Sequence, residues 1–145
     1  MIQLLIDTSV LIKWFHGEGE GELKQARALR SAHLAGALQA HMLDLASYEI
    51  GTVLTRSLRW PADDVADQLD DLHAILGPPL VMTTAWLRRA AELAQLHSLS
   101  FYDAGWAAVA AELRIPLISA DRRLLEAGLA ESPSDITSRL DLRPD

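Results

Sequence analysis

The 145-residue sequence contains no cysteine, and this absence excludes disulfide bonds, thiolate metal sites and cysteine nucleophiles. It has no apolar run approaching the roughly 18 residues that a membrane-spanning helix needs. The N-terminus turns acidic at Asp7 and lacks the basic-then-apolar order of a signal peptide. We therefore expect a cytoplasmic protein without membrane contact.

Positive charge is also scarce, because 13 Lys and Arg stand against 20 Asp and Glu, for a net charge of −7. Taken alone, this charge argues against broad nucleic-acid binding, since phosphate contacts normally need a basic surface. It permits a site for divalent cations or a partner with a basic segment. Half of the residues are hydrophobic and 23% are charged, so composition and length predict one globular domain over residues 1–145.

Several familiar catalytic motifs are missing as well. The sequence has no P-loop, no glycine-rich dinucleotide fingerprint and no Ser-His-Asp pattern. The histidines are scattered without a ligand-spaced pair, so we expect surface or packing roles for His16, His33, His41, His73 and His97.

The sequence does contain short apolar runs that alternate with amphipathic stretches. We predict strands at residues 2–6, 36–42, 80–83 and 115–119, and a short last strand around Ile136. We predict helices beginning in residues 10–15 and spanning residues 22–34, 43–59, 62–76, 85–96, 101–114 and 122–127. Strands alternating with helices indicate an α/β sandwich with a mostly parallel sheet, in which the first strand is central.

Four acidic residues occupy unusual positions in this pattern. Asp7 directly follows the first strand, and Asp121 lies two residues beyond the strand at 115–119. Glu49 interrupts the apolar face of its helix, where an acid is costly to bury unless it is paired, protonated or bound to a metal. Asp103 falls in the first turn of an apolar helix. Two alternatives stay open, because Asp7 could serve only as a helix N-cap and Asp103 only as a first-turn acid favoured by the helix dipole.

If the sheet is parallel, these acids can converge at its C-terminal edge, where open α/β sheets bind ligands. Carboxylates held that close repel one another unless some take up protons or a divalent cation offsets the charge. Oxygen ligands without cysteine or paired histidine suit Mg²⁺ or Mn²⁺ and not Zn²⁺. Such a cation can activate water and stabilise the charge on a reacting phosphorus, which indicates phosphodiester hydrolysis.

With these residues laid out, the sequence resembles the PIN-domain family, and most closely its VapC-type toxin ribonucleases of bacterial toxin–antitoxin pairs. The matching stretches span nearly the whole chain: IDTSVLIKWF at the start, YEIGTVLTR around Glu49, SFYDAGWAAVA around Asp103 and LISADRRLL around Asp121. Any one of these stretches is a weak signal, but all four in this order in a chain of this length are fairly specific.

The resemblance implies a PIN-like three-layer α/β/α sandwich with a mostly parallel central sheet. It further implies endonucleolytic cleavage of RNA by a metal-activated water. The catalytic and metal-binding residues would hold one or two Mg²⁺ ions, which Mn²⁺ can replace. These residues are Asp7, Glu49, Asp103 and Asp121. Thr8 and Ser9 match hydroxyl positions that help to orient the first acid.

The resemblance also implies a cognate antitoxin whose tail wraps the toxin and blocks the site. It implies a homodimer that forms a larger hetero-oligomer with the antitoxin.

An acidic protein can still bind RNA if a few basic side chains lie where the RNA binds. The candidates are Lys13, Arg27, Arg30, Arg122 and Arg123. The last two rank highest because they directly follow Asp121, although each of the five could equally be a solvated surface charge.

Two alternatives to an RNA endonuclease toxin were weighed. A phosphatase of the haloacid-dehalogenase kind also begins with an acid at a strand end, but its second Asp falls where this sequence has Ser9. A non-catalytic PIN-like interaction module would be supported by loss of an acid, and none of the four is lost.

Overall fold

The structure is a computed structural model, and it describes residues 1–143. None of the helices in this part of the chain is both long and apolar enough to cross a membrane. The elements follow in the order β1 (Ile2–Ile6), α1 (Thr8–Leu11), the 3-10 helix η1 (Ile12–Trp14), α2 (Leu23–Leu34), β2 (Leu38–His41), α3 (Leu45–Thr52), the π-helix η2 (Val53–Ser57), α4 (Ala62–Leu76), α5 (Thr84–His97), α6 (Phe101–Leu113), β3 (Leu117–Ile118), α7 (Arg122–Glu126) and α8 (Pro133–Arg139).

The sheet in residues 1–143 has three strands in the order β2-β1-β3, and both pairings are parallel. β1 is central, as predicted, and Leu5 lies between His41 of β2 and Leu117 of β3. Leu4, Leu5 and Ile6 are all fully buried, since helices cover both faces of the strand. This explains why the strand reads as an unbroken apolar run instead of an alternating one.

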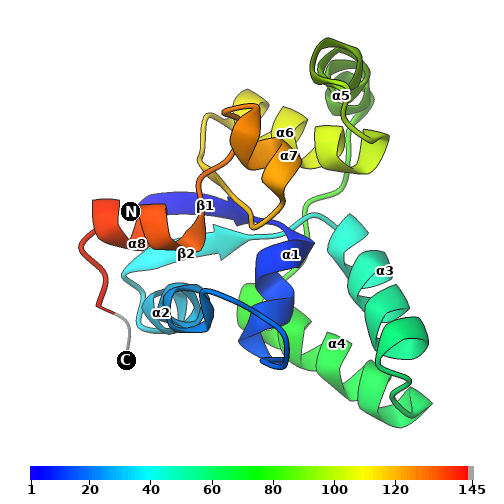
Figure 1. The fold of residues 1–145 in the computed structure, drawn as a ribbon, viewed down its shortest axis with the longest axis vertical. Coiled ribbons are helices and arrows are strands. Elements are labelled where there is room, and N and C mark those ends of the chain that lie inside the picture. Colours follow the sequence, from blue (N-terminus) through cyan, green and yellow to red (C-terminus); the bar gives the residue numbers. More distant parts are fainter. Residues whose placement is uncertain (144–145) are drawn as a thin grey trace.

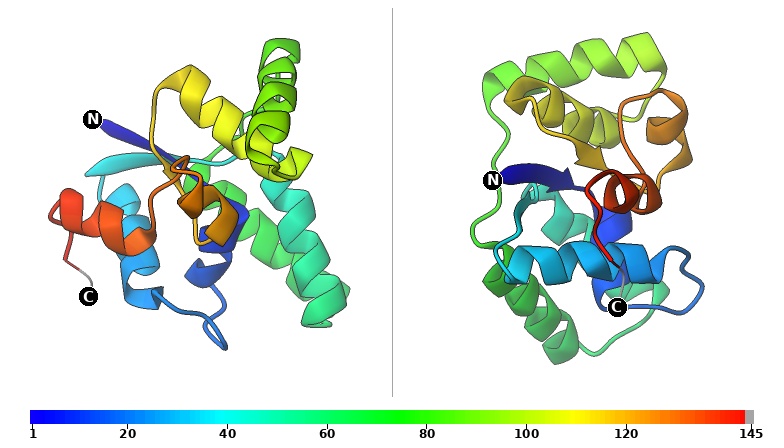
Figure 2. Two further views of the ribbon diagram at one scale, coloured as in Figure 1. Left: turned by 45° about the horizontal axis from the view of Figure 1, so that its top comes forward. Right: turned by 90° about the vertical axis from the view of Figure 1, so that its left-hand side faces the viewer.

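The helices form two layers with the sheet between them (Figure 1). The right-hand view of Figure 2 shows α5 and α6 above the sheet and α2 and α4 below it. In α6, Trp106 and the run Ala107–Ala110 are buried, so this helix is apolar around most of its circumference. The predicted α/β/α sandwich with a parallel sheet is thereby confirmed.

Two strand predictions are wrong. The predicted strand at residues 80–83 is reduced to one parallel bridge between Leu80 and Leu43. Ile136 lies in α8 and not in a strand, and its side chain is fully buried there. Ser132 caps this helix and Pro133 occupies its first turn, a combination that favours helix over strand. The predicted helix at 43–59 begins as α3 and changes to the π-helix η2 at Val53.

Parallel pairing aligns the C-terminal ends of β1 and β3. The backbone N–H of Asp7 donates to the carbonyl oxygen of Ile118 at 3.1 Å. The residues that follow the two strands, 7–9 and 119–121, therefore lie side by side at the C-terminal edge of the sheet. This is the edge at which α/β folds place their functional residues.

Candidate active site

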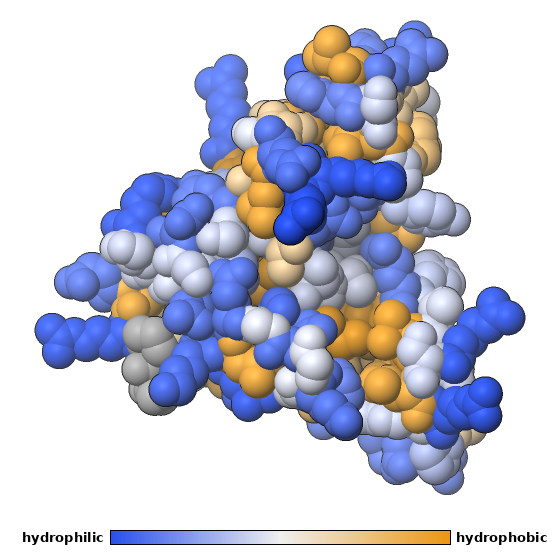
Figure 3. All heavy atoms as spheres, in the orientation of Figure 1, coloured by the Kyte–Doolittle hydropathy of each residue, from blue (hydrophilic) through white to orange (hydrophobic). Residues whose placement is uncertain are grey.

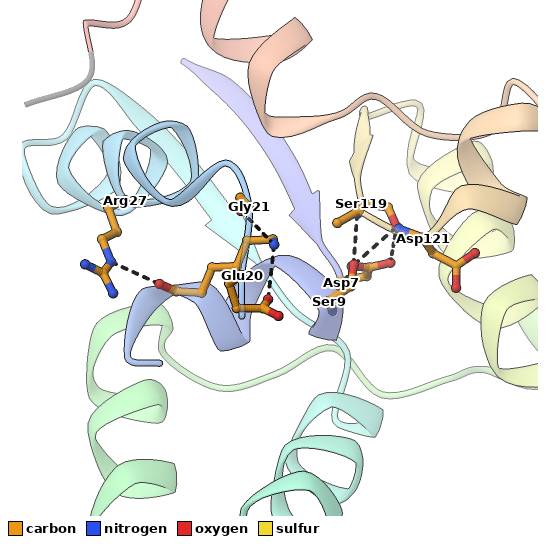
Figure 4. A network of polar contacts seen from close by, with 9 residues as sticks. Asp7, Ser9, Glu20, Gly21, Arg27, Ser119 and Asp121 are labelled. Atoms are coloured by element: carbon orange, nitrogen blue, oxygen red, sulfur yellow. Dashed lines mark hydrogen bonds and ion pairs between the residues drawn. The ribbon is translucent and has the colours of Figure 1, made fainter. Parts of the chain in front are cut away.

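Asp7 is the most tightly held acid at this edge. Its side chain is only 4% exposed, and both carboxylate oxygens accept hydrogen bonds. Oδ1 accepts from the backbone N–H of Ser9 at 3.1 Å and from Ser9 Oγ at 2.5 Å. Oδ2 accepts from Ser119 Oγ at 2.6 Å (Figure 4). Asp7 is thus the N-cap of α1, as one alternative proposed, but the cap uses only one of its two oxygens.

The two serines that hold Asp7 are themselves fixed by the loop after β3. The backbone N–H of Ala120 donates to Ser9 Oγ at 2.9 Å, and that of Asp121 donates to Ser119 Oγ at 2.9 Å. Each hydroxyl therefore accepts from the backbone and gives its own proton to the carboxylate. This arrangement fixes the orientation of Asp7 and ties it to the segment that carries Asp121.

Glu49 occupies the half-buried face of α3, and polar partners offset the cost of its position. Its Oε1 accepts a hydrogen bond from Thr8 Oγ1 at 3.0 Å and another from Trp106 Nε1 at 3.2 Å. Thr8 follows Asp7 in the chain, so Glu49 is linked to the end of β1. Trp106 lies one turn beyond Asp103 on α6, so Glu49 is linked to that helix as well.

Asp103 and Asp121 each stand at the start of a helix. Asp103 is in the first turn of α6, whose N-cap Ser100 accepts from the Asp103 backbone N–H at 3.1 Å. Asp121 is itself the N-cap of α7, and its Oδ1 accepts from the backbone N–H of Arg123 at 2.8 Å. Asp121 repeats the arrangement of Asp7, since each acid follows a buried strand and caps the short helix after it.

Electrostatic effects show that the four acids are grouped. Burial raises the pKa of Asp7 to about 6; the Ser119 and Ser9 hydrogen bonds oppose this rise, and the charges of Glu49 and Asp103 add to it.

The pKa values of the other half-buried acids shift in the same direction. Burial raises the pKa of Glu49, and the charge of Asp103 raises it further. Burial also raises the pKa of Asp103, with the charge of Asp121 as the next cause, while Arg123 opposes the rise. The pKa values of Asp7, Glu49 and Asp103 are therefore each raised by the charge of at least one other acid of the group.

The donor set of this site is chemically suited to a hard divalent cation. It consists of carboxylate oxygens, and a cation beside them would offset the repulsion that raises their pKa values. In residues 1–143, however, no three acidic or histidine side chains lie close enough together to hold one ion. The acids are thus close enough for their charges to interact, but no three of them form a ready-made set of ligands for one ion.

The placement of Lys13 contradicts its expected role as an RNA contact. Its side chain is buried, with the whole residue only 5% exposed. Its Nζ donates to Glu20 Oε1 at 3.1 Å and to the carbonyl oxygen of Gly21 at 2.8 Å (Figure 4). The ammonium group therefore anchors the glycine-rich loop that follows η1, and its charge is compensated inside the protein.

The four arginines among the candidates divide into two pairs. Arg27 Nε donates to the carbonyl oxygen of Lys13 at 3.0 Å, and Arg30 donates to that of Trp14, so both join α2 to the end of η1. Arg122 and Arg123 are exposed on α7. Arg123 lowers the pKa of Asp103 and so lies near this acid, whereas Arg122 Nε lies 3.9 Å from Glu126 Oε1.

The sequence analysis missed two residues of the site, Ser119 and Trp106. Ser119 is fully buried and supplies the bond to Asp7 Oδ2, and Trp106 supplies a bond to Glu49. A signal for Ser119 was present, since it is a hydroxyl residue at the end of a strand, two positions before an acid. The signal for Trp106 was its position one helical turn after Asp103.

The family model of the PIN domain matches residues 4–129, and the chain belongs to the PIN-domain family. This confirms the resemblance and removes the phosphatase alternative. Among curated proteins, the chain is similar to "Ribonuclease VapC3" of Pyrobaculum aerophilum. The two are 29% identical over 129 residues, which cover 86% of this chain and 94% of the relative.

Two solved structures have a similar fold. The crystal structure of PAE2754 from Pyrobaculum aerophilum matches with a TM-score of 0.67 and 26% identity, and covers 97% of both chains. A toxin-antitoxin complex from Klebsiella pneumoniae contains a chain that matches with a TM-score of 0.66 and 18% identity, over 90% of this chain and 97% of that one. At that identity, the second match shows the fold alone.

Proposed function

We propose that this protein is a metal-dependent endoribonuclease and the toxin of a toxin–antitoxin pair. The observation that carries the proposal is the buried Asp7 carboxylate, which two serines orient at the sheet edge where Glu49, Asp103 and Asp121 gather. Membership of the PIN-domain family and similarity to a protein named as a ribonuclease support RNA as the substrate.

Asp7, Glu49, Asp103 and Asp121 would hold one or two Mg²⁺ ions, which Mn²⁺ can replace. When bound, such a cation activates water and stabilises the charge that develops on the phosphorus. Mg²⁺ keeps several of its waters and usually binds only one or two carboxylates, so it does not require three acids around one point. Asp7 is held in place by Ser9 and Ser119 and would be the fixed ligand of the ion.

The surrounding residues prepare the site for RNA cleavage. Thr8 and Trp106 keep the Glu49 carboxylate directed toward the end of β1. Arg123, near Asp103, and Arg122 are both exposed on α7 and would supply positive charge for the phosphates that flank the cut. Local arginines of this kind let a protein with a net charge of −7 bind a polyanion.

The partners in this proposal are a cognate antitoxin and a second copy of the chain. The antitoxin would neutralise the enzyme by covering the acids, and the homodimer would join it in a larger hetero-oligomer in the cytoplasm. The likeness in fold to a chain of a toxin-antitoxin complex is consistent with an antitoxin partner. An acidic toxin is also suited to an antitoxin with a basic segment.

The test is cleavage of RNA by the purified protein. Mg²⁺ should support endonucleolytic cleavage, EDTA should stop it, and added Mg²⁺ should restore it. Asp7→Asn or Asp103→Asn should lower cleavage by at least about 100-fold, the usual effect of losing one electrostatic contact to a reacting group. Asp67→Asn is the matched control, since Asp67 is an exposed acid of α4, and this variant should cleave normally.

Thermal unfolding of each variant must accompany the cleavage assay, so that loss of activity is separated from loss of fold. Cleavage that continues in folded Asp7→Asn and Asp103→Asn variants would falsify the assignment of the site. Activity that survives complete chelation would instead contradict the metal requirement.

A further inference from the structure

Two exposed tyrosines border a pocket of about 360 Å³ beside the acids. Tyr48 of α3 is 73% exposed and Tyr102 of α6 is 62% exposed. In residues 1–143, neither ring belongs to an aromatic pair and neither hydroxyl has a hydrogen-bond partner in the protein. Single exposed aromatic side chains are common, but a contiguous apolar patch with a polar rim is typical of a binding site. Leu45 and Val53 complete an apolar lining between them.

The pocket is continuous with the candidate active site. Thr8 and Glu49, which are hydrogen-bonded to each other at 3.0 Å, form part of its wall. Tyr102 directly precedes Asp103 in α6. A substrate that binds at the acids can therefore place one of its groups in this pocket.

The charges around the site indicate which part of a nucleotide belongs in the pocket. Glu49 is the charged residue in its lining, and a carboxylate repels phosphate. The arginines that follow Asp121, Arg122 and Arg123, lie on α7, whereas residues of α3, η2 and α6 line the pocket. Arg56 is exposed on η2 but is not part of the pocket lining. Figure 3 shows apolar surface over α3, and strongly hydrophilic side chains both over α7 and beyond the outer edge of α3. The pocket is thus suited to a flat, uncharged group with polar edges.

We propose that this pocket binds a nucleobase of single-stranded RNA, next to the phosphodiester that is cut, by stacking on Tyr48 and Tyr102. Single-stranded RNA is commonly recognised through bases that stack on exposed aromatic side chains. The Glu49 carboxylate and the tyrosine hydroxyls offer polar contacts at the rim, which give this subsite a means to prefer one base over another. The inference rests on the proposed function and adds a determinant of target choice to it.

The experiment compares an RNA oligonucleotide with a mapped cleavage site and analogues that lack the base at each position flanking the cut. One abasic position should lower kcat/KM of the wild-type protein by about tenfold, the scale of one lost stacking contact. Tyr102→Ala and Tyr48→Ala should each lower kcat/KM on the intact RNA to a similar extent. These variants should lose little more on the abasic RNA, because the same contact is already gone.

Two control variants separate stacking from other causes. Tyr102→Phe keeps the ring and should retain most of the activity. Phe101→Ala removes a half-exposed ring that adjoins Tyr102 on the same helix but lies outside the pocket, and it should behave like the wild type on both substrates. The exposed positions of Tyr48 and Tyr102 predict unchanged unfolding temperatures.

Three results would overturn the inference. If the tyrosine variants lose as much kcat/KM on the abasic RNA as on the intact RNA, the missing base does not bind to these tyrosines. Normal cleavage by the alanine variants together with a changed oligomeric state, or with lost binding of a protein partner, would make the pocket a protein contact. Failure of the wild-type protein to cut any RNA would overturn the proposed function, and with it this subsite.

Discussion

At the scale of single residues, the protonation of Asp7 makes the stability of the fold depend on pH. Burial raises its pKa from the ordinary 3.8 to about 6, so the folded protein binds this proton more tightly than the unfolded chain does. The stability that comes from this proton is fully present below about pH 4 and is lost as the pH rises through about 6. At neutral pH, the metal-free fold therefore carries a buried carboxylate that opposes folding.

This linkage predicts a pH-dependent effect of Asp7→Asn in metal-free buffer. The variant's free energy of unfolding should rise relative to the wild type between pH 4 and pH 6, by on the order of 3 kcal/mol, and the difference should level off above pH 6. Chemical denaturation at several pH values measures it. Asp67→Asn, at an exposed position, should show no such trend. A difference that does not vary with pH would mean that Asp7 titrates normally in the fold.

At the scale of elements, the first helical segment is held by its neighbours more than by its own length. α1 has four residues and η1 has three, too few to be stable alone. Arg27 and Arg30 of α2 donate to carbonyl oxygens at the end of η1, while Trp14 Nε1 donates back to Ala26 of α2 at 2.9 Å. Lys13 adds the bonds to the loop that leads into α2.

This network predicts that Lys13→Met affects stability and not catalysis. The substitution keeps most of the buried stem but removes the hydrogen bonds of the ammonium group, so the free energy of unfolding should fall by about 1–3 kcal/mol. Cleavage of RNA should be unchanged at temperatures where the variant is folded. Lys24→Met, at an exposed position of α2, should change neither quantity. A variant that unfolds normally but cleaves poorly would restore Lys13 as an RNA contact.

Elements with a strong local pattern could be predicted from the sequence, and those defined by tertiary contacts could not. The helix predicted at 62–76 is α4 to the residue, because its apolar stripe follows a proline and ends at Gly77. The strand predicted at 80–83 failed because a short apolar run does not reveal whether a neighbouring strand is available for pairing.

The same division applies to the site. The strand-end and first-turn positions of Asp7, Asp103 and Asp121 were visible in the sequence as local patterns. Ser119 is recognisable in the sequence as a hydroxyl residue at a strand end, but its bond to Asp7 depends on the pairing of β1 with β3, which the sequence does not show. The burial of Lys13 was missed for a similar reason, since a loop distant from its own helical turn encloses it.

At the scale of the whole molecule, acidic residues are concentrated in two regions, and the other acids are scattered along the chain. Exposed acids lie along α4, where water solvates them: Asp63, Asp64, Asp67, Asp70 and Asp71. The other concentration is the partly buried cluster at the sheet edge, where burial and mutual repulsion raise the pKa values of three acids. Only the second concentration stores repulsion that a bound cation can relieve.

The proposed metal site therefore predicts that Mg²⁺ stabilises the whole fold. At about 100 times its Kd, a ligand that binds only the folded state adds about 2.7 kcal/mol, which corresponds to a rise in Tm of about 5–10 °C for a chain of this size. Thermal unfolding with Mg²⁺, and with KCl at the same ionic strength, measures the shift. Asp103→Asn should abolish most of it. An equal shift with both salts would reduce the effect to general screening.

The hydrogen bond between Ser119 and Asp7 joins residues that are 112 positions apart in the chain. During synthesis, β1 and Asp7 emerge well before the serine that orients Asp7 and the acids at 103 and 121. A nascent or truncated chain that ends before residue 119 lacks the finished site, whatever else it has folded. For a protein proposed to cut the RNA of its own cell, we expect translation products that end before residue 119 to be inactive.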